Sequence, residues 1–216
     1  MGVLPAVSEL HIVAFTVFTA AISTALIAVP GLLAAHWLAR HRTRGVLETL
    51  LALPLVLPPT AVGILLLQVF RPHGLLGFLS VVFTWRGVVV SCAVMSFPLL
   101  VRSARTAFEE VDPRLAQVAR TLGASPAQAF FRVTLPLARR GILAGLLLAF
   151  SRALGEFGAT ILVAGNIEGE TQTMALAIFQ RTQAGDDAGA MRLVAITVAL
   201  AFCAVFFTEW LGRRRP

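Results

Sequence analysis

Long apolar runs separated by short polar stretches follow one another along the whole chain. A run of about 20 uncharged residues is long enough to cross the hydrocarbon core of a bilayer as a helix. On this pattern we predict five spanning helices, at about residues 10–39, 47–70, 87–108, 137–164 and 192–211. The sequence therefore predicts an all-α integral membrane protein in which residues 1–216 form a single transmembrane domain.

The second apolar run is interrupted by the proline-rich motif LPLVLPP. Proline lacks the backbone N–H of a helical residue, so the helix is expected to kink or break there. A broken membrane helix usually lines protein or a cavity, although such prolines are also simply tolerated. We expect residues 71–86 to form a short outer loop or a re-entrant segment. Residues 165–191 are expected to form a second outer loop, with a short helix at 173–183.

Basic residues set the expected orientation of these spans. All 18 are arginine, and most of them flank apolar runs. The formal charge of +7 therefore indicates membrane topology and not a nucleic-acid partner. Arginines cluster after the first span at Arg40, Arg42 and Arg44, between the third and fourth spans, and in residues 213–215. Since cytoplasmic segments are enriched in arginine, we expect a multi-pass protein with its N-terminus outside and its C-terminus in the cytoplasm.

Residues 112–136, which we call the capped segment, carry two sets of helix-capping signals between the third and fourth spans. Asp112 precedes a proline, which is the order of an N-cap residue and a first-turn proline. Gly123 stands where a left-handed residue would end this first helix. Ser125 and Gln128 then have the spacing of a capping box that starts a second helix.

The second helix of the capped segment is expected to carry Phe130 and Phe131 on its apolar side and to end at Pro136. Arg120 and Arg132 lie among these apolar side chains. Such a mixture is typical of a surface that docks a partner protein. The alternative is an amphipathic loop that lies on the lipid headgroups.

Two charged residues, Arg152 and Glu156, interrupt the fourth apolar run. Residues four apart lie on one face of a helix, so the milder interpretation is an ion pair that lowers the free-energy penalty of both charges in lipid. The sharper interpretation is that Arg152 faces a pathway used by an anion.

Several kinds of chemistry are disfavoured by the residues that the sequence lacks. It contains no lysine, and therefore no phosphate-binding lysine of a Walker A loop. Its histidines and cysteines do not have the spacing of metal ligands, and no hydrolase motif is present. We expect no enzyme activity and no cofactor on this chain, with ATP and magnesium on a partner. A membrane enzyme or a channel is the alternative from another class.

The capped segment also carries a family resemblance. Residues 117–136 resemble the EAA loop of ABC importer permeases, in which Glu-Ala-Ala is followed by a glycine and then by Ile-x-Leu-Pro. Ala119, Gly123, Leu135 and Pro136 match that pattern at the same spacing. Gln117 replaces the glutamate. The resemblance implies the type I ABC importer permease fold, with the capped segment as a two-helix cytoplasmic coupling loop.

A narrower resemblance covers nearly the whole chain. The motifs LPLVLPPTAVG, WRGVVVSCAVMSFPLLVRSAR and LGEFGATILVAGNIEGETQT are similar to those of the molybdate permease group, whose close relatives are sulfate and tungstate permeases. The resemblance implies a prokaryotic cytoplasmic-membrane homodimer of permeases. It also implies two cytoplasmic ATPase subunits and an extracytoplasmic oxyanion-binding protein as partners, besides membrane lipid.

Two sets of candidate site residues follow. The candidates for coupling to the ATPase are Gln117, Ala119, Arg120, Gly123, Phe130, Phe131, Arg132, Leu135 and Pro136. The candidates for the substrate path are Pro58, Thr60, Arg152, Glu156, Asn166, Thr171 and Thr173. A broken helix end, hydroxyl groups and a cation are what a crossing oxyanion would need for transient compensation of its charge.

Overall fold

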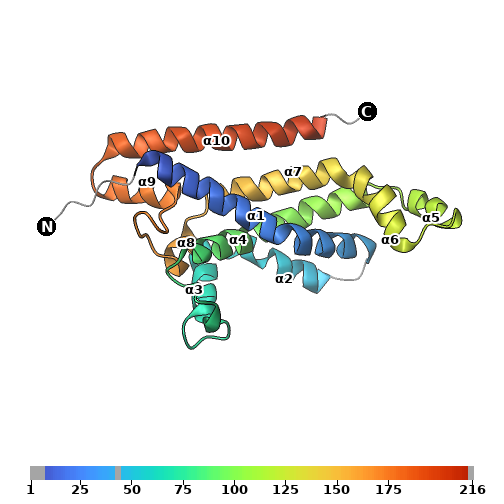
Figure 1. Ribbon diagram of the computed structural model, residues 1–216, viewed down its shortest axis with the longest axis horizontal. Helices are drawn as coiled ribbons and strands as arrows, with labels where there is room; N and C mark the ends of the chain where they lie inside the picture. Colours follow the sequence, from blue (N-terminus) through green and yellow to red (C-terminus); the bar gives the residue numbers. More distant parts are fainter. Residues whose placement is uncertain (1–7, 42–44, 214–216) are drawn as a thin grey trace.

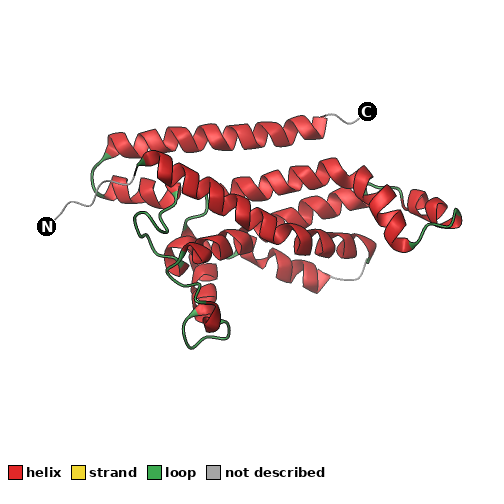
Figure 2. Ribbon diagram, viewed as in Figure 1, coloured by secondary structure: helices red, strands yellow, loops and turns green. Residues whose placement is uncertain are grey.

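A computed structural model describes residues 8–41 and 45–213 of the chain, with side chains described up to residue 207. Arg42, Arg44 and the last arginines of the C-terminal cluster, at 214 and 215, lie outside the described residues. Within these residues the chain is built of helices and loops (Figure 2). The helices are α1 (Glu9–Arg40), α2 (Gly45–Val56), α3 (Pro59–Phe70), α4 (Trp85–Glu109), α5 (Pro113–Thr121), α6 (Pro126–Ala129), α7 (Leu135–Leu154), α8 (Gly158–Val163), α9 (Met174–Gln183) and α10 (Asp187–Arg213).

The long helices α1, α4, α7 and α10 lie side by side along the longest axis of the molecule (Figure 1). Each is long and apolar enough to cross a membrane, and α2 with α3 adds a fifth crossing if that bent pair is one span. Helix α1 starts at one end of the bundle and α10 finishes at the other. With that pair counted as one span, the number of crossings is five, which is the number predicted from the sequence.

Helix α4 forms the centre of the bundle, packed between α1 and α7. The closest approach is made by Gly141 and Gly145 of α7, which have the GxxxG spacing of closely packed membrane helices. A Cβ atom added at Gly141 would lie 2.5 Å from the Cβ of Ala107, and one at Gly145 would lie 3.0 Å from Ser103. Small residues are therefore required at this contact because the two backbones nearly touch.

The second predicted span, residues 47–70, is broken as its prolines suggested. Helix α2 runs through Pro54 and ends at Val56, and α3 starts at Pro59 after a bend of 108°. Helix α3 therefore points away from the bundle axis (Figure 1). The following loop contains a short 3₁₀ helix, η1 (Gly77–Leu79), before α4 begins.

Two boundary predictions around α7 are wrong. The fourth span was expected to extend to residue 164, but α7 ends at Leu154 and residues 155–157 separate it from α8. The second helix of the capped segment was expected to end at Pro136. Instead, α6 continues through a π-helical turn, η2 (Phe130–Thr134), directly into α7. The wider turn accommodates a proline, which has no N–H to give to the helical ladder.

At the end of the bundle where α1 begins, one carboxylate joins three helices. Glu9 of α1 accepts from Arg181 of α9 at 2.7 Å and is paired with Arg192 of α10 at 3.0 Å. Nearby, the backbone N–H of Met174 donates to the hydroxyl of Thr16 at 2.9 Å. These contacts fix α9, the short helix predicted in the second outer loop, against α1.

Candidate functional site

The first helix of the capped segment, α5, has the caps that the sequence predicts. The carboxylate of Asp112 accepts from the N–H of Arg114 at 2.9 Å. At the other end, Gly123 has a φ of +91°. The N–H groups of Gly123 and Ala124 donate to the carbonyls of Arg120 and Ala119, both at 3.0 Å. This is the Schellman arrangement, so α5 ends through its own sequence.

The capping box of α6 is also present. Ser125 N–H donates to the side-chain oxygen of Gln128 at 2.9 Å, and Gln128 N–H donates back to the Ser125 hydroxyl at 3.2 Å. Helix α6 is continuous with η2 and α7 and is therefore joined directly to a spanning helix. The capped segment is thus one free helix, α5, joined by a tight turn to the end of a spanning helix.

The surface of the capped segment is apolar and exposed. Leu115, Val118 and Leu122 of α5 are 47%, 55% and 83% exposed, and Phe131 is 64% exposed. Between α5 and α6 lies an open groove of about 450 Å³. Its lining residues are Gln117, Arg120, Thr121, Ala124 and Pro126. An exposed apolar stripe beside a polar groove has the form of a docking surface.

The two adjacent phenylalanines of the capped segment have different environments. Phe130 is half-buried, with its ring 4.6 Å from His36 of α1 and 6.1 Å from Phe108 of α4. It anchors the segment to the bundle. Phe131 points outward, and Arg132 beside it is exposed. Both phenylalanines were expected on the surface that contacts the partner, but only Phe131 is exposed.

Four candidates for the substrate path, Pro58, Thr60, Arg152 and Glu156, lie in or beside the place where two helix breaks meet, at residues 57–60 and 155–160, which we call the break region. A Cβ atom added at Gly158 would lie 2.7 Å from the Cβ of Pro59 and 3.3 Å from the backbone nitrogen of Thr60. Further along, one added at Gly63 would lie 2.9 Å from the Cα of Ala159. The starts of α3 and α8 are therefore in direct contact, while the side chain of Thr60 is exposed.

Arg152 and Glu156 form the predicted ion pair, at 2.7 Å, but not on one continuous helix. Glu156 follows the end of α7, and its other carboxylate oxygen accepts from the N–H of Ala159 in α8 at 2.8 Å. The Glu156 side chain is only 1% exposed, whereas that of Arg152 is 26% exposed. Glu156 therefore joins the end of α7 to the start of α8.

The interior beside the break region is unusually polar. Ser91 and Ser96 of α4 and Thr160 of α8 are fully buried, and their hydroxyl oxygens have no hydrogen-bond partner among the described residues. Buried polar atoms normally have at least one hydrogen-bond partner. These hydroxyls were not predicted as site residues, because serine and threonine are common in membrane helices and no spacing distinguishes these three.

The remaining candidates for the substrate path lie apart, in the loop before α9. Thr171 accepts from the N–H of Ile167 at 2.9 Å, and Thr173 is the N-cap of α9. Asn166 donates to Gln180 at 2.7 Å. Gln180 also accepts from Gln172 at 2.6 Å. These side chains hold the loop in shape, and Gln180, their common partner, was not singled out from the sequence.

No group of three or more His, Cys, Asp or Glu side chains in the described part of the chain is placed to hold a metal ion. The geometry instead offers an exposed surface at the arginine-rich end of the bundle and a polar break within it.

Comparison with known proteins agrees with this geometry. The family profile "Binding-protein-dependent transport system inner membrane component" matches residues 27–215. The molybdenum transport system permease protein ModB of Escherichia coli K12 is 48% identical over 178 residues, 79% of this chain and 78% of that protein. The sulfate transport system permease protein CysT of Salmonella typhimurium is 36% identical over 207 residues, 92% and 75% of the two chains.

A solved structure of a bacterial alginate ABC transporter, in complex with an alginate-bound periplasmic protein, superposes with a TM-score of 0.67. The match is 17% identical and covers 95% of this chain and 78% of that one. It supports the predicted fold, that of an ABC transporter permease. With the family profile covering most of its length, the chain belongs to the inner membrane components of binding-protein-dependent transport systems.

Proposed function

We propose that this chain is the permease subunit of an ATP-driven importer that moves molybdate across the cytoplasmic membrane. The observation that carries the choice of substrate is the 48% identity to a molybdenum permease, against 36% to a sulfate permease. A sulfate or tungstate permease of the same architecture is the second candidate. The N-terminus lies outside and the C-terminus in the cytoplasm, as the arginine distribution favours.

The capped segment is the site where a separate ATPase docks. It lies at the same end of the bundle as the arginine-rich ends of α1 and α4 (Figure 1). Exposed Leu115, Leu122 and Phe131 supply the apolar contacts, and Gln117 and Arg120 line the groove beside them. ATP and magnesium bind to that partner, and its closure moves α7 because α6 and α7 are one continuous helix.

Two further partners complete the transporter. A second copy of this chain covers the apolar face of α3, where Ile64 and Leu65 are exposed. A periplasmic oxyanion-binding protein delivers the substrate to the end of the bundle where Glu9 joins α9 and α10. The structurally similar alginate transporter likewise binds a periplasmic protein.

The substrate passes the break region on the side of α3. Thr60, in the first turn of α3, is exposed, and the N-terminus of a helix attracts anions. Arg152 is a poorer candidate because its charge is already balanced by Glu156. Asn166, Thr171 and Thr173 act indirectly, by fixing the loop that precedes α9.

Competitive uptake tests the substrate. Membrane vesicles containing this chain, its ATPase and its binding protein should accumulate labelled molybdate when supplied with ATP. Unlabelled molybdate should reduce this uptake at lower concentration than tungstate or sulfate does. Sulfate uptake without molybdate uptake would transfer the assignment to the second candidate.

Capture of the ATPase tests the docking surface separately. The change Phe131→Asp places a charge at the exposed apolar contact, and we expect about 30-fold weaker binding, equivalent to about 2 kcal/mol at an interface hot spot. The matched control is Phe78→Asp, at a residue 78% exposed in the loop between α3 and α4. Equal capture of both variants would show that the ATPase docks elsewhere.

A further inference from the structure

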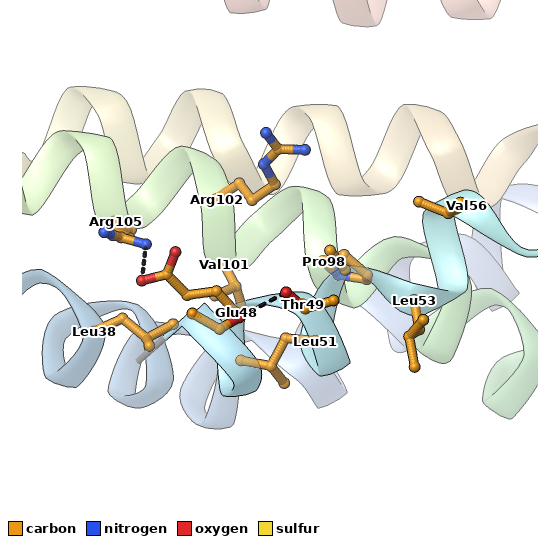
Figure 3. Close-up of a pocket in the computed structure, with 12 residues that line it drawn as sticks. Leu38, Glu48, Thr49, Leu51, Leu53, Val56, Pro98, Val101, Arg102 and Arg105 are labelled. Carbon is orange, nitrogen blue, oxygen red and sulfur yellow. Dashed lines mark hydrogen bonds and ion pairs between the residues drawn. The ribbon is translucent and has the colours of Figure 1, made fainter. Parts of the chain in front are cut away.

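A groove of about 540 Å³ runs between α2 and α4 at the arginine-rich end of the bundle (Figure 3). Its volume is that of a small-molecule site. The groove ends at Val56, next to the break region, but no residue of the break region or of the capped segment lines it. Its apolar lining includes Leu51, Leu53 and Val56 of α2 and Pro98 and Val101 of α4.

One end of the groove is charged. Arg105 of α4 is paired with Glu48 of α2 at 2.7 Å, and with Glu109 on its own helix at 2.7 Å. This bridge holds α2 against α4, as the dashed contact in Figure 3 shows. Arg102, one turn earlier on α4, is exposed and forms no ion pair with any described residue. The charged end therefore carries one arginine whose charge is not balanced.

The groove runs parallel to α2 and α4, with a charged end and an apolar end. From Glu48 to Val56 on α2 is about 12 Å at the helical rise, and from Arg105 to Pro98 on α4 is about 10 Å. The arginine end lies at the level of the other basic helix ends, where a membrane protein meets the lipid headgroups. Toward Val56 and Pro98 the lining is apolar.

The lining discriminates among the possible occupants. A free oxyanion would leave water for mostly apolar walls, at a high desolvation penalty. A second copy docked face to face by twofold symmetry would bring the two unbalanced Arg102 side chains toward each other. A phospholipid satisfies both ends, since basic pockets between membrane helices on the cytoplasmic side bind anionic headgroups.

We propose that this groove binds an anionic phospholipid, with the phosphate at Arg102 and one acyl chain between α2 and α4. The bound lipid supports α2, which has no fully buried residue and is held to the bundle by partly buried Leu51 and by the Arg105–Glu48 bridge. This makes the segment that leads into the break region sensitive to the lipid beside it. The site is independent of which oxyanion the protein transports.

Photolabelling of the full chain in vesicles tests the proposal. The probe is a phosphatidylglycerol with a photoactivatable acyl chain in a phosphatidylcholine bilayer, and labelled peptides are mapped by mass spectrometry. We expect labelling of both α2 and α4 in the groove. The change Arg102→Gln should reduce it about fivefold, the factor for about 1 kcal/mol per arginine at an anionic lipid surface.

Two further variants test separately whether labelling depends on the charge of Arg102 and on the open volume of the groove. Arg139→Gln removes an exposed arginine at the same end of the bundle, outside the groove, and should leave labelling unchanged. Ala52→Phe fills the groove without changing its charge and should reduce labelling of α4. Because Arg102 is exposed, the Arg102→Gln variant should fold, and it tests the proposal even if Ala52→Phe does not fold.

Four results would overturn the proposal. They are equal labelling by a photoactivatable phosphatidylcholine, unchanged labelling of the Arg102→Gln variant, and crosslinks between two copies through α2 in place of lipid labelling. The fourth is loss of labelling when free sulfate is added at constant ionic strength, which would assign Arg102 to a soluble anion.

Discussion

The capped segment and the break region both interrupt the bundle, but different interactions determine their shapes. Helix α5 is delimited by residues within or next to it, with the Asp112 carboxylate at its start and Gly123 at its end. In the break region, Glu156 reaches the N–H of Ala159, and Gly158 touches Pro59 from a distant part of the chain. Water can satisfy frayed backbone groups at the surface, whereas inside a bilayer the protein must satisfy them itself.

This difference predicts where substitutions are tolerated. A surface helix whose caps are local can lose one cap and remain attached, because the bundle does not depend on it. The break region is held by a buried carboxylate and by backbone contacts, so the loss of one of these interactions should destabilise the whole region. Substitutions of the exposed apolar side chains of α5 should therefore leave the fold intact, whereas substitutions of the buried polar side chains near Glu156 should destabilise it.

The largest effect is expected from Arg152→Met. The change leaves the Glu156 carboxylate, which is 1% exposed, without its counter-charge. Breaking a buried ion pair from one side costs about 3–5 kcal/mol, and we expect about 3 kcal/mol because Arg152 is partly exposed. The measurement is the thermal unfolding midpoint of the purified chain in detergent.

Glu156→Gln is the informative counterpart. Glutamine keeps an oxygen for the Ala159 N–H and leaves the charge on Arg152, the more exposed partner. Its effect should be clearly smaller than that of Arg152→Met, and the double variant should recover part of the lost stability. If the two single variants were equally damaging, the burial of Glu156 would not be the reason.

A smaller loss is expected from Gly158→Ala. The added methyl carbon would lie 2.7 Å from the Cβ of Pro59, so α3 and α8 must move apart. Overpacking of this kind costs about 1–3 kcal/mol. Gly155→Ala is the matched control, because nothing lies within 4 Å of a Cβ added there. Equal unfolding midpoints for the two variants would show that the α3–α8 contact is not tight in solution.

The sequence predicted the capped segment better than the break region for the same physical reason. Asp112, Gly123, Ser125 and Gln128 act on residues at most five positions away, so their spacing alone identifies the caps. The exception was Pro136, whose missing N–H was expected to end a helix. A π-helical turn precedes it instead, and Phe130 in that turn packs against Phe108 of α4.

In the membrane, the apolar runs predicted the spans and the prolines predicted the break in the second one, but the break after Leu154 was not predicted. The contact of Pro59 with Gly158 joins residues about a hundred positions apart, which no local pattern contains. The spacing of Arg152 and Glu156 predicted the correct pair on a helix that does not continue that far. Gly141 and Gly145 did carry a readable signal, the GxxxG spacing, for the close contact between α7 and α4.

The smallest effect is expected at Gly123, and it tests whether the caps of α5 act on that helix alone. At Gly123, φ is +91° and nothing lies within 4 Å of an added Cβ, so Gly123→Ala strains only the backbone, by about 1 kcal/mol. Hydrogen exchange of the amides at the end of α5 should accelerate about fivefold, with α4 and α7 unchanged. Gly185→Ala, at φ +77° with equally open surroundings, should accelerate only the loop between α9 and α10. Since the same strain is applied at both positions, faster exchange in α7 after Gly123→Ala alone would mean that α5 is coupled to the bundle even without its partner, and that its caps are not purely local.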